Sequence, residues 1–416
     1  MQKSPDRTLA TALLAILFFH MICESMVIPV LAPTLASPIS EAHDMLLGFS
    51  PRLHKFFYGI SLAIYPIAIF ICAPLLGSLS DTIGRKPVLT AALIGTVAGS
   101  IAQGFGMEFL SLPIFIVGRI LVGATAGVDG VIQAALLDKC STQAQKNRYL
   151  GMTLLAMSLG FILGPAFSAS MIDENATTLA WSIPFFVLAI CFSVTIPVLN
   201  VTYGSRRARP LKQSTQKVEW FKGLRDIMKL KNASGATRLL SIFSLNQIAG
   251  GIMVTIIPLL LIQDFSFSVK KTAVFMSVMG VFSALVFAFG DRLIARFSPF
   301  AMLRATLLTS AFCVIIAATS PFEAVMWAVT ILFPAGFSMS YFALISIFSQ
   351  SVPKEHSGWM MSVMSALWGL TSGIGMALCG FLSGISDILS MAVCALIAAG
   401  AFALSFGERS IPEIKL

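Results

Sequence analysis

The chain has 416 residues, of which 57% are hydrophobic and only 11% are charged, and its mean hydropathy is +0.88. Soluble domains carry about 25% charged residues, so this composition excludes a soluble globular protein and predicts a polytopic membrane protein. The net charge of +9 does not indicate a nucleic-acid partner, because the 28 Lys and Arg residues are scattered among apolar segments and cannot form one basic stripe.

Twelve apolar segments are each long enough to cross a bilayer, which takes about 20 residues as a helix. The first begins after MQKSPDR, exceeds the apolar length of a signal peptide, about 7 to 15 residues, and carries Glu24, so we predict a retained span. In chain order the predicted spans are 8–36, 56–79, 87–106, 110–138, 147–171, 180–202, 236–263, 270–296, 300–319, 322–351, 357–383 and 387–406.

The predicted fold class is therefore an all-α integral membrane protein with twelve transmembrane helices in two six-helix halves, 1–202 and 236–416. Counting the span ends that adjoin each connection, four Lys or Arg residues belong to the odd-numbered connections, whereas 23 belong to the termini and the even-numbered connections, and Arg119 lies within a span. Because basic loops stay in the cytoplasm, both termini are predicted to be cytoplasmic.

The segment 203–235 between the halves is a basic linker with nine Lys or Arg residues. Within it, Phe221, Leu224 and Met228 share one helical face, which predicts an interfacial helix on the anionic cytoplasmic leaflet. The alternative is a solvated linker without a membrane contact.

Short sequence similarities relate the two halves. Residues 28–31 (IPVL) correspond to residues 257–260 (IPLL), and a Gly-x-x-x-Gly pattern occurs at Gly160 and Gly164 and again at Gly369 and Gly373. Together with the 6+6 layout, these similarities favour two structural repeats, as in many secondary transporters.

None of the seven cysteines occurs in a C-x-x-C motif. Each lies in or beside an apolar run, where a cysteine most often packs as a small hydrophobic residue. We therefore predict no disulfide, metal site or cofactor.

Residues 77–89 (GSLSDTIGRKPVL) form the junction between the second and third spans. Gly84 can supply a left-handed turn, and Pro87 suits the first turn of the next helix. Asp81 can then meet a helix N-terminus or a base across the gap between the halves. Two bases would anchor the cytoplasmic end, Arg85 and Lys86. The alternative is a tight turn with no gating role.

Three patterns together resemble the signatures of the major facilitator superfamily. They are Gly77-x-Leu79-Ser80-Asp81-x-x-Gly84-Arg85-Lys86-Pro87-x-Leu89, Arg119-x-x-x-Gly123-x-x-Ala126 and Gly151-x8-Gly160-x3-Gly164-Pro165. The third resembles the pattern of the proton-coupled drug exporters with twelve helices, although Ser168 and Ala169 stand where that branch has glycines. The resemblance implies a gate at residues 77–89, a half-to-half interface at Gly160, Gly164 and Pro165, and a part for Arg119 in proton coupling. Small-residue packing is the alternative for the glycines.

Ionisable residues inside the spans are costly unless they face a cavity or a partner. His20 and Glu24 are four residues apart and share a helix face, while Arg119 and Asp129 lie ten residues apart in the fourth span. The resemblance places the first, fourth, seventh and tenth helices around a central cavity, where a carboxyl can exchange a proton for a substrate. Glu24 is the first choice for this exchange. Static pairing is the alternative for His20, Glu24 and Asp129. A packing and orientation role is the alternative for Arg119.

Polar residues of the seventh and tenth spans are possible cavity-lining groups, namely Asn246, Gln247 and Tyr341, although they could equally bridge helices.

The sequence thus predicts a proton-coupled secondary transporter, without catalytic residues, that works by alternating access as a monomer in a bacterial inner membrane. Its expected partners are protons, lipid and a small amphipathic or cationic molecule exported by antiport. Within transport, the alternatives are a proton symporter, an importer and a carrier of siderophores or polar metabolites. A polytopic membrane enzyme or receptor is the alternative of another class, but the chain has no H-E-x-x-H motif.

Overall fold

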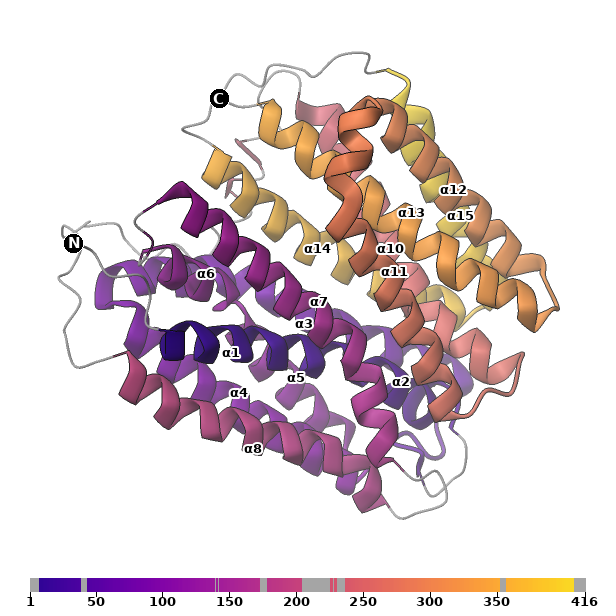
Figure 1. Cartoon of the computed structure of the whole chain (residues 1–416). Helices are drawn as coiled ribbons and strands as arrows, with labels where there is room; N and C mark the ends of the chain where they lie inside the picture. The colour runs from indigo at the N-terminus through magenta and orange to yellow at the C-terminus, as the bar shows by residue number, and fades with distance from the viewer. Residues whose placement is uncertain are drawn as a thin grey trace. The chain divides into compact units, whose positions relative to one another are not determined.

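The computed structural model describes the helical core of the chain, shown in Figure 1. The described residues are 7–38, 43–138, 140, 142–172, 178–203, 225, 226, 228, 229, 236–351 and 357–407. Every regular element among them is helical, and twelve helices are long and apolar enough to cross a membrane. Helices satisfy their own backbone hydrogen bonds, which lipid cannot do for them. The predicted fold class and the twelve spans are confirmed.

The chain divides into two compact units. Unit 1 comprises Met1–Val30, Ser40–Met45 and Ile67–Lys222, and unit 2 comprises Leu31–Ile39, Leu46–Pro66 and Gly223–Leu416. Unit 2 therefore includes the end of the first span and the first half of the second span, in addition to the six C-terminal spans.

In unit 1, α1 packs against α7 and α8, and α4 packs against α5 and α8. Figure 1 shows that α1 and α4 each run alongside α8. The elements of the first six spans are α1 (Arg7–Ser25), α2 (Val27–Leu31), η1 (Ala32–Ala36), α3 (Pro51–Ile83), α4 (Arg85–Glu108), α5 (Leu112–Ala126), α6 (Asp129–Leu137), α7 (Gln143–Met171) and α8 (Thr178–Thr202).

In unit 2, α10 packs against α14 and α15, and α12 packs against α13 and α15. A buried core that includes Phe243, Leu344 and Phe348 joins α10, α12, α13, α14 and α15. The elements are α10 (Ala236–Gln263), α11 (Val269–Arg296), α12 (Pro299–Thr319), α13 (Glu323–Gln350), α14 (Ser357–Ser383) and α15 (Asp387–Ser405).

The same pairing of spans occurs in both units. The first span contacts the fifth and sixth in unit 1, as the seventh contacts the eleventh and twelfth in unit 2. The third contacts the fourth and sixth, as the ninth contacts the tenth and twelfth. This correspondence supports the structural repeat that the short sequence similarities indicated.

Two spans are interrupted helices. The first span breaks after Ser25 and ends in the π-helix η1, near Pro29 and Pro33. The fourth span breaks between Ala126 and Asp129. The expected single helix over 110–138 is thus two helices, and Asp129 begins the second.

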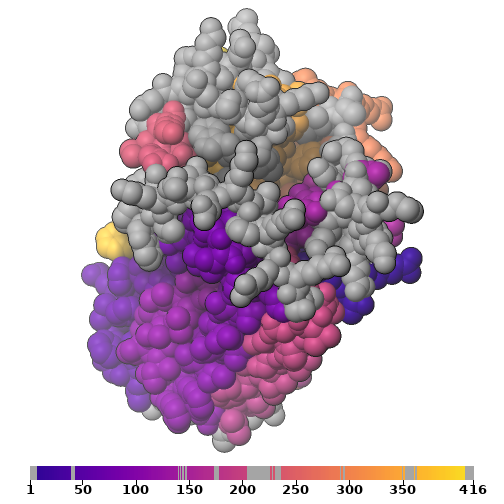
Figure 2. Space-filling view, turned by 90° about the vertical axis from the view of Figure 1, so that its left-hand side faces the viewer, coloured from indigo at the N-terminus to yellow at the C-terminus, as the bar shows by residue number. Residues whose placement is uncertain are grey.

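The basic linker is described only in part. The predicted interfacial helix, with Phe221 and Leu224, lies outside the described residues, and Met228 is exposed. Many large apolar side chains of the spans are also exposed, among them Leu154, Ile190 and Leu396, as expected for surfaces that face lipid. On the face that Figure 2 shows, the helices of unit 1, purple to pink, form a continuous surface.

Candidate functional site

A buried acid and base cluster lies inside unit 1. His20 projects from α1, and its Nδ1 lies 2.8 Å from Oδ1 of Asp129 in the first turn of α6. The two side chains are 1% and 17% exposed. The carboxylate also lies at a helix N-terminus, whose partial positive charge favours an anion. The structure thus pairs His20 with Asp129, as the static-pairing alternative for His20 predicts.

Glu24 lies one helical turn after His20 on α1, where Arg119 and Asp129 are its electrostatic neighbours. The Arg119 side chain on α5 is only 2% exposed. The structure thus brings together all four ionisable residues that the sequence singled out. Buried acids and bases are stable together only while their charges compensate one another, so binding of a proton or a cation would change the charge balance of the whole group.

The break in the fourth span lies within this cluster, since Arg119 precedes it on α5 and Asp129 follows it on α6. Interrupted transmembrane helices often mark the binding sites of transporters, because the free helix ends can meet a ligand. A signal for the break was present in the sequence as Gly123, Gly127 and Gly130.

Polar residues of α4 extend the cluster. Ser100 on α4 lies near Cys23 of α1, and Gln103 follows one turn later beside Gly118. Gln103 is fully buried, and neither its Nε2 nor its Oε1 has a hydrogen-bond partner in the described part of the chain. A buried amide without a partner costs about 1 to 3 kcal/mol. Gln103, which the sequence analysis did not single out, can thus serve as donor and acceptor to a group that enters the cluster.

The junction between the second and third spans is much shorter than the 13 residues read from the sequence. Helix α3 continues through Asp81 to Ile83, and α4 begins at Arg85. Gly84 alone separates them with φ of +99°, as predicted, because only glycine adopts such a conformation at little cost. Gly77 lies within α3, and a Cβ added to it would have no other atom within 4 Å.

Charged side chains of this junction make ion pairs and a hydrogen bond with other residues of unit 1. An Arg85 Nη1 donates to Asp81 Oδ1 at 2.8 Å, and Arg85 Nε lies 3.4 Å from Asp138 Oδ2. Lys86 Nζ donates to the carbonyl of Asn200 at the end of α8, 2.9 Å away. Because Asp81 is 59% exposed, its ion pair contributes little to stability. The predicted role of Asp81 in gating stays a proposal.

The glycines of the fifth span lie against α1. A Cβ at Gly160 would overlap the Phe18 carbonyl, and one at Gly164 would overlap Ser25 Oγ and lie 2.9 Å from the Ile22 carbonyl. These glycines therefore let α7 approach the backbone of α1 closely. Pro165 lies inside α7, which continues to Met171.

Unit 2 holds a smaller polar group. Asn246 and Gln247 on α10 are 2% and 1% exposed, and Asn246 Oδ1 accepts a hydrogen bond of 3.1 Å from Ser340. Tyr341 is half-buried, and its ring packs near Phe243. This contact shows Asn246 bridging α10 and α13, while its Nδ2 and the Gln247 Nε2 have no hydrogen-bond partner among the described residues.

Comparisons with known proteins agree with this architecture. The family model of the Major Facilitator Superfamily matches residues 13–376. The chain is 26% identical over 325 residues to the class C tetracycline resistance protein of Escherichia coli, covering 76% of this chain and 78% of that protein.

Solved structures share the fold. The human organic anion transporter MFSD10 aligns with a TM-score of 0.67 at 17% identity, covering 97% of this chain and 100% of that chain. A D-xylose-proton symporter aligns with a TM-score of 0.74 at 13% identity, covering 97% of both chains. With the family model matched over most of its length, the chain belongs to the major facilitator superfamily and is a transporter of the integral membrane class, not an enzyme.

Proposed function

We propose that this protein is a proton-coupled antiporter that works by alternating access and exports a small amphipathic or cationic molecule. The observation that carries the proposal is the buried group of Glu24, Arg119, Asp129 and His20. Glu24 would bind either a proton or the cationic group of the substrate, while Arg119 disfavours both being held at once. Competition of two cations for one carboxylate couples their movements in opposite directions.

The proposed location is a bacterial inner membrane with both termini in the cytoplasm. It rests on the Lys and Arg bias of the connections and on relatives from Escherichia coli. In this orientation the junction of Asp81, Gly84 and Arg85 faces the cytoplasm.

The proposal of export is supported by the relatives named for tetracycline resistance. A proton symporter or importer is the second candidate, since a D-xylose-proton symporter shares the fold. The two candidates differ in the direction in which protons move with the solute.

Inverted membrane vesicles that contain the full chain test the proposal, with tetracycline as the first probe and ethidium as a second, cationic one. Acidifying the vesicle lumen should drive uptake of a probe, and an ionophore that collapses the pH gradient should abolish that uptake. Uptake driven instead by an alkaline lumen would support the symporter, and uptake that ignores the gradient would contradict proton coupling.

Asp81→Asn is expected to slow turnover about 3- to 10-fold without weakening substrate binding. The substitution removes the 2.8 Å pair with Arg85, which is too exposed to contribute more than about 1 kcal/mol to stability, so its effect should appear in the conformational step. Initial rates over a range of probe concentrations separate the two quantities. Normal turnover with lost affinity would contradict a gating role.

A further inference from the structure

A pocket of about 780 Å³ lies in unit 2, away from the polar group of Asn246 and Gln247. It is formed by the start of α3, the ends of α10 and α12, and the connection from α14 to α15. Its volume is within the range of about 300 to 1,000 Å³ that small-molecule sites span. Nothing in the proposed coupling reaction uses this pocket.

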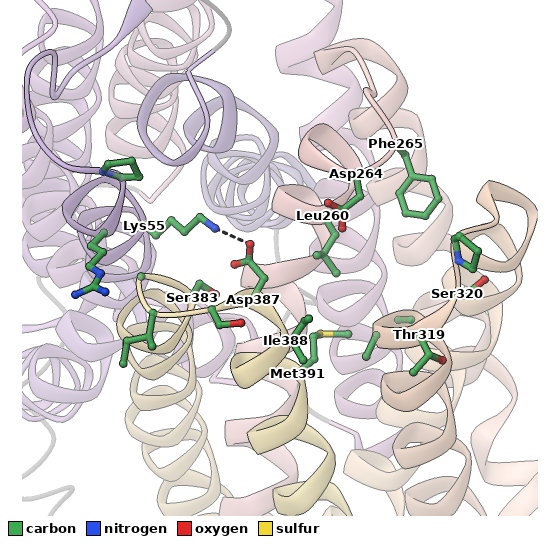
Figure 3. A pocket seen from close by; sticks show the side chains of 18 residues that line it. Lys55, Leu260, Asp264, Phe265, Thr319, Ser320, Ser383, Asp387, Ile388 and Met391 are labelled. Carbon is green, nitrogen blue, oxygen red and sulfur yellow. Dashed lines mark hydrogen bonds and ion pairs between the residues drawn. The ribbon is translucent and has the colours of Figure 1, made fainter.

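Four charged residues line the pocket, and an ion pair joins two of them, Lys55 and Asp387. Lys55 Nζ pairs with Asp387 Oδ2 at 2.5 Å. In Figure 3, Asp264 lies beyond Asp387 on the side away from Lys55. Asp387 Oδ1 is buried and has no hydrogen-bond partner among the described residues. Arg52, the remaining charged residue of the lining, has an exposed side chain.

Asp264 and Asp387 act on one another. Asp264 is exposed at the rim of the pocket, and its pKa lies above its ordinary value because partial burial disfavours its charged form and because Asp387 repels the charge, whereas Lys55 opposes the shift less strongly. A second cation between the two carboxylates would relieve this repulsion.

The backbone adds to the preference for positive charge. Three helices end at the pocket, α10 at Gln263, α12 at Thr319 and α14 at Ser383, while two begin there, α3 and α15. Helix C-termini carry a partial negative charge. Opposite the charged pair, Figure 3 shows Phe265, Leu260 and Met391 as an apolar wall.

We propose that this pocket binds an amphipathic organic monocation, with its charged group between Asp264 and Asp387 and its apolar body against Phe265. The pocket offers the ligand two carboxylates; Asp387 is paired with Lys55, and the second basic side chain of the lining, Arg52, is exposed. The site is separate from proton coupling at Glu24.

Tetraphenylphosphonium, a permanently charged apolar cation, is the probe, and the purified full chain is the sample. Thr319→Cys places a thiol at an exposed position of the lining, and Phe322→Cys is the matched control, because it lies at the same end of unit 2 outside the lining. The unsubstituted chain supplies the background, since its seven cysteines are free thiols.

A cationic methanethiosulfonate reagent should label Thr319→Cys faster than an anionic one, and tetraphenylphosphonium should slow this labelling but not that of Phe322→Cys. Adding Asp264→Asn should weaken the protection about 3- to 10-fold. Adding Glu323→Gln should leave it unchanged, because Glu323 pairs with Lys271 outside the lining.

The protection should also weaken as the pH falls through the raised pKa of Asp264, because protonation removes the charge that holds the probe.

Glu24→Gln separates this site from the proposed coupling site. Protection of Thr319→Cys that persists in the Glu24→Gln chain supports the pocket, whether or not transport is found. Two results would overturn the proposal and leave the antiport proposal standing. The first is that tetraphenylphosphonium does not protect Thr319→Cys in a chain with no other substitution, and the second is that Asp264→Asn leaves this protection intact.

Discussion

Glu24→Gln is expected to lower proton-driven transport by about 100-fold or more, in line with the loss of a group that transfers protons. Glutamine keeps the size of the side chain and one acceptor oxygen but can neither bind nor release a proton. Its neighbours Arg119 and Asp129 would then no longer be linked to the gradient. Initial rates of gradient-driven flux in proteoliposomes measure the effect.

The matched control is Glu108→Gln on α4, which removes a carboxylate that accepts a hydrogen bond of 3.1 Å from Ser182. It should transport at nearly the normal rate. Equal thermal unfolding of both variants and the parent chain would show that the fold is intact. Unchanged gradient-driven flux in Glu24→Gln would remove Glu24 from the mechanism.

Gly164→Ala is expected to destabilise the protein by about 1 to 3 kcal/mol, the usual cost of overpacking a close contact. The new Cβ would overlap Ser25 Oγ and lie 2.9 Å from the Ile22 carbonyl, so α7 and α1 would have to separate. A lower midpoint of thermal unfolding in detergent, followed by size-exclusion chromatography, is the measurement.

Gly151→Ala on the same helix is the control, since nothing lies within 4 Å of its added Cβ. It should be as stable as the parent chain or slightly more so, because alanine favours a helix. Adding Ser25→Ala should partly restore Gly164→Ala by removing the closest obstructing atom. Equal stability of Gly164→Ala and Gly151→Ala would show that α1 and α7 do not require a glycine there.

The fold was largely predictable because bilayer thickness imposes a length and an apolar composition on each span. The seventh predicted span, 236–263, has the bounds of α10. Local backbone detail was less predictable. The charged junction after Gly77 read as a loop, yet α3 continues to Ile83, since charged residues at a membrane surface do not end a helix as glycine does at Gly84.

The candidate site was predictable in its ionisable residues but not in their pairing. Charge inside an apolar span identified His20, Glu24, Arg119 and Asp129, whereas the His20 contact to Asp129 depends on the break before α6. Gln103 was missed because an uncharged amide in a span is a weak signal, and only its burial without a partner distinguishes it.

The central claim is proton antiport, and purified protein in proteoliposomes with a pH-sensitive dye inside tests it most directly. Adding tetracycline or ethidium on one side, without a preset gradient, should move protons in the opposite direction, and Glu24→Gln should not do so. For a one-to-one exchange, a pH difference of one unit should support about tenfold accumulation of the probe, since tenfold corresponds to about 1.4 kcal/mol. Movement of the probe with no proton movement, or with protons in the same direction, would contradict the claim.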